Sequence, residues 1–416
     1  MAARKKPSCP VEAYAQAVAD GKIPAGNLIR LTCERHLKDL KTAKMRGLFF
    51  DHEASAFAIQ FFSFLKHSKG EWAGCTFELQ HWQQFIVGSL FGWKRADGTR
   101  RFRVAYVEVP RKNGKSTMLA GIGLYLLIAD GEPGAEVYAA ATKRDQAKIV
   151  WGEAAKMVKS SPALTKRVTT YMGKGNMNFP ALGSKFEPLG ADSDTMDGLN
   201  VHAAIIDELH AHKTRAVWDV LDTATGSRRQ PLLFAITTAG TDQTSVCYEQ
   251  HERARKLLEG VIEDDAYFAF IACLDEGDDY ADPATWAKAN PNFGISVKED
   301  DLRRKAKTAK ESPAALNAFL RLHLNKWTQQ VDRWIDLDVW DGNAGIVKEE
   351  ALAGRTCYGG LDLSSMDDMT AWVMVFPKED DPDEIDILCR FWVPEAQLKK
   401  DSNRYNHYKA RIQRMF

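Results

Sequence analysis

A lysine and a hydroxyl beside it stand where a strand-like run gives way to a helix-like run. Lys115 and Ser116 belong to the segment Pro110 to Thr117. In a phosphate-binding loop, backbone N–H groups and the helix N-terminus hold the phosphates, the lysine reaches their oxygens and the hydroxyl binds Mg²⁺. Val109 replaces the first glycine of the usual pattern, and a helix start that merely carries Gly-Lys-Ser is the alternative. The context favours a nucleotide-phosphate site.

Two acids follow a second apolar run, Ala203 to Ile206. In a nucleotide hydrolase, Asp207 would hold Mg²⁺ directly or through water, and Glu208 would orient and deprotonate the attacking water. A buried strand followed by a solvated acidic turn is the alternative. The spacing from Lys115 leaves room for an intervening strand and helix. Together these residues predict an ATPase of the additional-strand, catalytic-glutamate type.

Two weaker signals agree with this prediction. Thr237 and Thr238 end the run that starts at Leu232, where hydroxyls could sense the γ-phosphate, although an ordinary strand end is equally compatible. Gln83, about 30 residues before the loop, could read the adenine edge through its amide. An amide on an exposed helix face is the commoner explanation for such a glutamine.

Two patterns that suggest metal sites lack the ligands or the spacing that such sites need. The segment Asp192 to Asp194 lacks the later ligands of a calcium loop. The histidines at 202, 210 and 212 match no zinc spacing, so we expect them to be solvated or packed.

Strand-like runs that alternate with helix-like runs must position these side chains. The expected strands are 103–109, 136–141, 202–206 and 232–238, and the expected helices are 115–129, 144–159 and 214–225. Apolar strands alternating with helices predict an α/β fold with a parallel-rich sheet covered on both faces. The pattern from 239 to 326 indicates a mainly helical segment. Three further strands are expected at 356–362, 370–376 and 385–393, and the acidic run 378–386 should be a solvated hairpin tip.

These features predict four regions. They are an N-terminal helical region (1–75), a P-loop ATPase domain (76–326) with a helical lid at about 241–326, a linker (327–354), and a last region (355–416).

Composition excludes several classes of protein. Apolar residues make up 45% and charged residues 27%, as in soluble globular proteins. Lysine plus arginine equals aspartate plus glutamate at 56 each, so bulk-cationic nucleic-acid binding is excluded, whereas a local basic patch is not. Seven cysteines without a CxxC pair favour reduced thiols, and no apolar run is long enough to span a membrane. We expect a soluble, intracellular protein.

Taken in order along the chain, the motifs resemble the large terminase subunit of tailed bacteriophages, the motor ATPase and nuclease that packages DNA. The resemblance rests on the segments 79–83, 111–117, 197–200, 205–210, 236–240, 322–327 and 359–363. An arginine-containing phosphate loop without its first glycine also looks like this family.

The resemblance implies roles for these residues and names partners. The loop residues that would bind ATP and Mg²⁺ are Arg111, Lys112, Asn113, Gly114, Lys115, Ser116 and Thr117. Asp207 and Glu208 would hydrolyse ATP, and Thr237 and Thr238 would couple hydrolysis to movement. A ring-forming homo-oligomer on the portal is implied, with double-stranded DNA, the portal protein and the small terminase subunit as partners in the host cytoplasm. The arginine that acts on the γ-phosphate could be Arg144, Arg228 or Arg229.

The family's C-terminal domain is similar to RNase H and uses an acidic cluster to hold two divalent metals, Mg²⁺ or Mn²⁺. Asp362 matches the first ligand, and Asp368 is a less certain neighbour. The sequence stops at Phe416, before the segments that carry the other acids, so we expect an incomplete nuclease. Truncation of the chain, a split gene or a decayed prophage copy would each explain this.

Basic residues around the turn Asp97-Gly98 could face DNA or merely solvent: Lys94, Arg95, Arg100, Arg101 and Arg103. Two rival functions remain. The segment 207–210 also fits a DExH helicase, although the QxxGRxxR arginine motif of a second motor domain is missing after residue 240. A non-catalytic prophage remnant that binds DNA or portal is the other.

Overall fold

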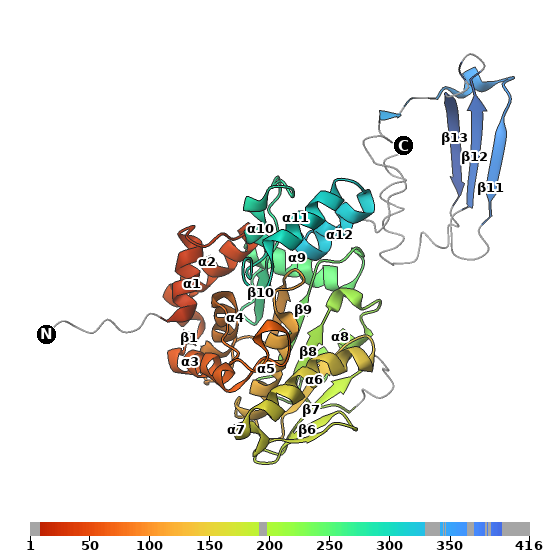
Figure 1. The fold of residues 1–416 in the computed structure, drawn as a ribbon. Helices are drawn as coiled ribbons and strands as arrows, with labels where there is room; N and C mark the ends of the chain where they lie inside the picture. Colours follow the sequence, from red (N-terminus) through yellow and green to blue (C-terminus); the bar gives the residue numbers. More distant parts are fainter. Residues whose placement is uncertain are drawn as a thin grey trace. The chain divides into compact units, whose positions relative to one another are not determined.

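The computed structural model describes residues 9–190, 198–328, 342–343, 345, 347–363, 370–378, 381 and 384–392. The chain divides into two compact units, residues 1–333 and 334–416 (Figure 1). None of the helices among the described residues is long and apolar enough to cross a membrane.

An eight-stranded sheet forms the centre of the first unit, in the order β10-β3-β9-β8-β4-β7-β6-β5. Its strands are β3 (Val104–Glu108), β4 (Glu136–Ala140), β5 (Thr169–Tyr171), β6 (Asn176–Phe179), β7 (Ser184–Leu189), β8 (Val201–Asp207), β9 (Leu232–Thr237) and β10 (Tyr267–Ile271). The first six in this order are parallel, and β6 and β5 add antiparallel pairs. β9 lies between β3 and β8, so the additional-strand arrangement is confirmed.

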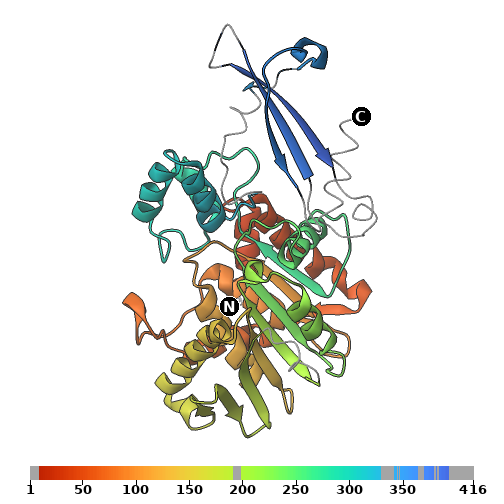
Figure 2. The same ribbon diagram turned by 90° about the vertical axis from the view of Figure 1, so that its right-hand side faces the viewer.

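The sheet forms because its central strands are apolar on both faces. Successive residues alternate between two cores: Ala105, Ala203 and Phe234 pack on one face, and Tyr106, Ala204 and Leu233 on the other. Helices α4 (His81–Gly92), α5 (Lys115–Ile128) and α6 (Arg144–Ser160) cover the first face, and α8 (Ala216–Thr223) and α9 (Val246–Leu258) cover the second (Figure 2). The predicted α/β fold with a covered, parallel-rich sheet is confirmed.

The N-terminal helices belong to the same core as the sheet. These are α1 (Pro10–Ala19), α2 (Asn27–Thr42) and α3 (His52–Phe61), and the short strands β1 (Leu48–Phe50) and β2 (Trp93–Arg95) pair beside them. Asp51 caps α3 by accepting hydrogen bonds from the N–H groups of Glu53 and Ala54. The helical character expected for residues 1–75 is thus present, and it is packed against α4.

The stretch after residue 239 is not as helical as the sequence suggested. β10 is a fully buried strand in that stretch, and α9 covers the sheet. A run of five apolar residues cannot be separated from a buried helix by periodicity alone, which explains the error. The helices α10 (Pro283–Ala289), α11 (Glu299–Ala309) and α12 (Pro313–Leu324) form a small core of their own with Leu274 and Val297.

Two of the five basic residues around the turn at Asp97 and Gly98 lie in the interior. Arg100 pairs with buried Asp130 at 2.9 Å, and Arg101 pairs with Asp39 at 2.7 Å. Because both arginine side chains are buried, the suggestion that they face DNA or solvent is wrong for them. The remaining three, at positions 94, 95 and 103, are half-buried.

In the second unit, three successive strands form an antiparallel sheet, as predicted: β11 (Tyr358–Asp362), β12 (Thr370–Pro377) and β13 (Ile385–Trp392). The Lys378 N–H donates to the carbonyl of Glu384, which closes the hairpin between β12 and β13. Most of the expected linker, and Asp368, lie outside the described residues.

Candidate nucleotide-binding and hydrolysis site

The loop between β3 and α5 has the backbone shape of an anion-binding nest. Gly114 caps α5 with φ of 78°, and Lys112 has φ of 71°, so both lie in the left-handed region. Glycine adopts this region without strain, whereas lysine does so at a cost that the surroundings must offset. The turn leads directly into the N-terminus of α5, where N–H groups and the helix dipole favour bound anions.

Asparagine side chains hold this loop in place from the outside. Asn113 is fully buried; its Nδ2 donates to the Oδ1 of Asn290 at 3.0 Å, and its Oδ1 accepts from the N–H of Asn292 at 3.0 Å. Ser296 Oγ donates to the carbonyl of Lys112 at 2.6 Å. The Asn113 side chain therefore fixes the loop, and any contact of this residue with a nucleotide would come from its backbone.

Lys115, Ser116, Asp207 and Glu208 meet at the carboxyl edge of the sheet. Lys115 Nζ donates to the Val109 carbonyl at 3.1 Å and lies 3.7 Å from Glu208 Oε1. Ser116 Oγ donates to Asp207 Oδ2 at 3.4 Å. Glu208 has φ of 53°, a strained conformation of the kind that gathers at functional sites. The sequence separated these groups by about 90 residues, and the fold brings them together.

Burial shifts the pKa values of two charged groups at this site, Asp207 and Lys115. Burial, reinforced by the negative charge of Glu208, raises the pKa of Asp207 to about 6. Burial also lowers the pKa of the Lys115 ammonium, although both acids act against that shift. Desolvation therefore destabilises the charged forms of Asp207 and Lys115, and the same desolvation strengthens contacts with a charged substrate.

Asp207 and Ser116 provide the kinds of ligand atom that a magnesium ion prefers. Asp207 Oδ1 is buried and has no hydrogen-bond partner, while Oδ2 faces the Ser116 hydroxyl. Magnesium prefers carboxylate and hydroxyl oxygens and keeps several water ligands. Asp207 and Ser116 would hold the ion together with the phosphates of a nucleotide.

Thr237 and Thr238 are fully buried beside Asp207 and Glu208. Thr237 Oγ1 accepts a hydrogen bond from the N–H of His210 at 3.1 Å and lies 3.0 Å from His210 Nδ1. His210 Nδ1 in turn lies 3.2 Å from Glu208 Oε2. The His210 side chain therefore lies between the predicted sensor threonines and Glu208, the predicted base.

A cavity of about 890 Å³ opens beside the phosphate loop, between the segment 67–83 and the segment 292–296. Gly114, Thr117 and Gln83 line it. Gln83 is only 2% exposed, so the suggestion of an amide on an exposed helix face is wrong. Its Oε1 accepts from the N–H of Gln80 at 3.0 Å, which fixes the amide at the cavity wall.

The three candidate arginines lie in different surroundings. Arg144 is exposed at the start of α6, which follows the carboxyl end of β4. Arg228 donates to the carbonyls of Gly134 and Asn200, which precede β4 and β8 at the opposite edge of the sheet. Arg229 is exposed next to it. Of the three, Arg144 is the one at the same edge as Lys115.

The other predicted positions lie apart from this site. Asp362 is exposed at the end of β11 in the second unit. The rejected calcium-like segment lies outside the described residues. His202 and His212 are buried, His202 Nε2 lies 2.7 Å from Asp130 Oδ2, and neither joins a metal-ligand cluster among the described residues.

Sequence reasoning assigned no role to several residues that contact the site from distant segments. They are His210 as a contact of the threonines, the asparagines at 290 and 292, and Asn325 and Trp327. The two asparagines flank Pro291, a turn signal that could have drawn attention to them.

Comparison with known proteins agrees with this geometry. Two family models match in succession: "Terminase large subunit, ATPase domain" over residues 81–256 and "Terminase large subunit, endonuclease domain" over residues 261–416. The chain belongs to the terminase large subunit family. The terminase ATPase match contains the phosphate loop, both acids and both threonines.

Individual proteins are also similar to this chain. The chain is 30% identical to the terminase large subunit of Enterobacteria phage HK97 over 71% of its own length and 58% of the relative's. It is 35% identical to Protein YmfN of Escherichia coli K12, over 48% of its own length and 44% of the relative's. The chain spans about half the length of these curated relatives. The crystal structure of the HK97 large terminase superposes with a TM-score of 0.58 and 26% identity, covering 85% of this chain and 72% of that one.

Proposed function

We propose that this terminase chain hydrolyses ATP and uses the energy to translocate double-stranded viral DNA into a procapsid. The observation that supports the proposal most directly is the meeting of Lys115, Ser116, Asp207 and Glu208 at one sheet edge, with β9 between their strands. Family membership supplies the DNA-packaging part of the proposal.

Each residue has a defined task in hydrolysis. The nest at Lys112 to Gly114 and the ammonium of Lys115 bind the phosphates. Mg²⁺, when bound, neutralises charge that develops on the transferred phosphoryl group. Glu208 orients the attacking water and takes its proton. Thr237 and Thr238 respond to the γ-phosphate through His210, which contacts both Glu208 and Thr237.

The partners follow from the family. Such a motor acts as a ring of identical subunits on the portal protein, in the host cytoplasm, with the small terminase subunit and duplex DNA. A packaging motor must grip any sequence, so it should contact phosphates without reading bases. An arginine from a neighbouring subunit would complete the site, and Arg144 is the candidate at the appropriate edge.

The second unit carries a separate proposal. We infer that Asp362, which ends β11, is the first ligand of an RNase H-like site for two Mg²⁺ or Mn²⁺ ions. The endonuclease family model covers this region as far as Phe416. The incompleteness expected from the sequence stays a prediction.

ATP hydrolysis by the full chain, measured with and without duplex DNA, tests the proposed motor. We expect turnover that duplex DNA stimulates more than single-stranded DNA does. Glu208→Gln should lose at least about 100-fold in turnover while it still binds nucleotide, because the amide cannot accept the proton. Glu34→Gln, an exposed glutamate of α2, is the matched control and should be unchanged.

Three outcomes would contradict the proposal. Turnover that persists in Glu208→Gln would move the chemistry away from this site. Stimulation by single strands alone would favour the helicase hypothesis, and nucleotide binding without turnover in any assembly would favour a non-catalytic remnant.

A further inference from the structure

A buried carboxylate that hydrolysis does not use ends β3, directly before the phosphate loop. Glu108 is fully buried, and its Oε2 accepts hydrogen bonds from three side chains. The donors are the Tyr106 hydroxyl at 2.6 Å, His251 Nδ1 at 2.9 Å and Trp327 Nε1 at 3.3 Å. A buried charge is tolerated only when it is paired in this way.

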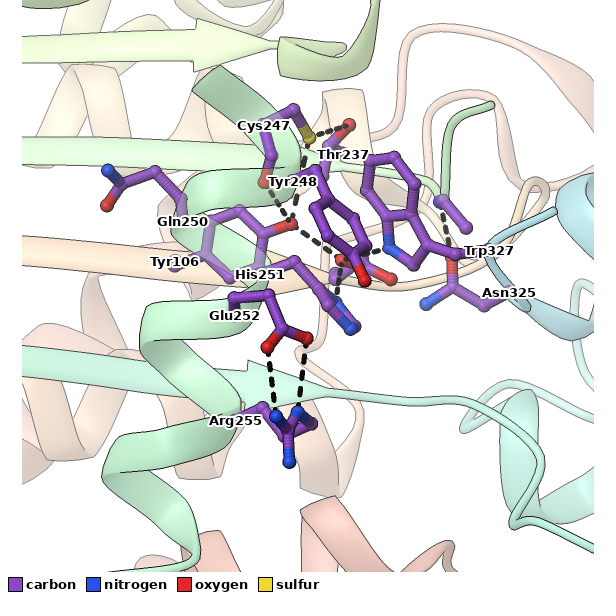
Figure 3. A network of polar contacts seen from close by, with 12 residues as sticks. Tyr106, Thr237, Cys247, Tyr248, Gln250, His251, Glu252, Arg255, Asn325 and Trp327 are labelled. Atoms are coloured by element: carbon purple, nitrogen blue, oxygen red, sulfur yellow. Dashed lines mark hydrogen bonds and ion pairs between the residues drawn. The ribbon is translucent and has the colours of Figure 1, made fainter. Parts of the chain in front are cut away.

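Glu108 is paired with His251 on α9. Burial alone would lower the pKa of His251, but the nearby carboxylate and its hydrogen bond outweigh burial and raise it. His251 also lies against the ring of Tyr248, with which its ring is stacked, and against Trp327 (Figure 3). The pair therefore gives Trp327 a fixed acceptor at the end of β3.

Two residues just after α12, Asn325 and Trp327, contact the predicted coupling loop, residues 237–240. Asn325 Oδ1 accepts a hydrogen bond from the N–H of Ala239 at 2.7 Å, and its Nδ2 donates to the Ala272 carbonyl at 2.8 Å. The Trp327 ring packs on Gly240 so closely that a Cβ there would lie 2.9 Å from the ring. The loop at 239–240 is thus held by a hydrogen bond from its backbone to the Asn325 side chain, and by the Trp327 ring, which leaves room only for glycine at position 240.

The same segment touches the nucleotide site at two more places. The Arg111 N–H in the phosphate loop donates to the Leu322 carbonyl at 2.9 Å. Thr237, at the start of the coupling loop, contacts His210, and His210 contacts Glu208. Residues 322–327 therefore contact the phosphate loop, the coupling loop and the end of β3 together, immediately before the chain leaves the first unit.

We propose that Asn325 and Trp327 are positioning residues that hold Thr237 to Gly240 in register with Glu208. The proposal rests on the ATPase function proposed above. Neither residue touches the reacting atoms, so their loss should slow hydrolysis without weakening nucleotide binding.

Trp327→Phe tests the contacts of the indole, because it removes the N–H that reaches Glu108 together with the outer ring atoms that lie on Gly240. We expect kcat to fall about tenfold while KM and the Kd for an ATP analogue stay within about twofold, in line with the loss of one hydrogen bond to Glu108. Trp151→Phe is the matched control. It loses a buried indole bond of 2.9 Å to the Phe186 carbonyl, away from the site, and should keep its kcat.

Hydrogen–deuterium exchange provides a readout that does not depend on turnover. Asn325 has φ of 57°, which glycine and aspartate both tolerate. In Asn325→Gly, the Ala239 amide loses its acceptor, and peptides covering 237–241 should exchange several-fold faster. Asn325→Asp keeps the acceptor for the Ala239 amide but replaces the donor to the Ala272 carbonyl with an oxygen, so it should restore only part of the protection.

Unchanged exchange at 237–241 in Asn325→Gly, or an equal loss of kcat in Trp151→Phe, would overturn the proposal. A rise in KM that accounts for the whole effect of Trp327→Phe would also overturn it. If the wild-type chain hydrolyses no ATP, the ATPase proposal fails, whereas the exchange experiment still decides whether Asn325 positions the loop.

Discussion

Asp207 illustrates, at the scale of a single residue, how a ligand site is built at the expense of stability. Its pKa of about 6 lies above the ordinary value of 3.8, because burial and Glu208 disfavour the charged form. The folded protein therefore binds this proton more tightly than the unfolded chain. Stability from this group is present at low pH and is lost as pH rises between about 4 and 6. At neutral pH the carboxylate costs at most roughly 3 kcal/mol.

We predict that Asp207→Asn is more stable than the wild type at pH 7.5 without Mg²⁺, and that the difference shrinks at pH 4.5. Urea unfolding followed by circular dichroism at both pH values, in EDTA, measures this. Asp222→Asn, an exposed residue of α8, controls for a general effect of removing a carboxylate. A lower midpoint for Asp207→Asn at pH 7.5 would show that Asp207 is not destabilised by its surroundings.

At the scale of elements, the loop 290–296 after α10 determines the shape of the phosphate loop. Asn292 accepts a hydrogen bond from Trp82 Nε1 at 2.7 Å and donates to the Asn113 carbonyl at 3.3 Å. We predict that Asn292→Ala loses roughly 1–3 kcal/mol of stability and binds an ATP analogue about tenfold more weakly, because buried partners are left unsatisfied. Fluorescence titration with a labelled nucleotide measures the affinity.

Asn176→Ala is the control for that prediction, since Asn176 donates to Glu187 at the far, antiparallel end of the sheet. It should lose stability and keep its affinity. Equal weakening in both variants would mean that the loop 290–296 has no specific role in nucleotide binding.

The same scale shows what could be predicted from the sequence. β3, β8 and β9 were predictable because each is a buried apolar run that ends in a chemically distinctive residue, and the positions of Lys115, Asp207 and Glu208 followed. β10 was missed because it is a run of only five apolar residues with no chemically distinctive residue at its end, and periodicity cannot distinguish such a run from a buried helix. Asn290 and Asn325 were given no role because the groups that tie them to the site, the Asn113 amide and the Ala239 N–H, lie 177 and 86 residues away, and no local pattern encodes such contacts.

At the scale of the whole molecule, the proposed ring makes each active site a shared property of two subunits. In a head-to-tail interface, Arg144 of one subunit would complete the site of its neighbour. We predict that Arg144→Ala and Glu208→Gln are each inactive alone, and that an equimolar mixture regains about a quarter of wild-type turnover. That fraction follows because a working site needs an intact glutamate beside an intact arginine, each with a chance of about one half. Arg229→Ala should remain active without mixing. No recovery in the mixture, under conditions where the wild-type ring is active, would exclude Arg144 as the shared arginine.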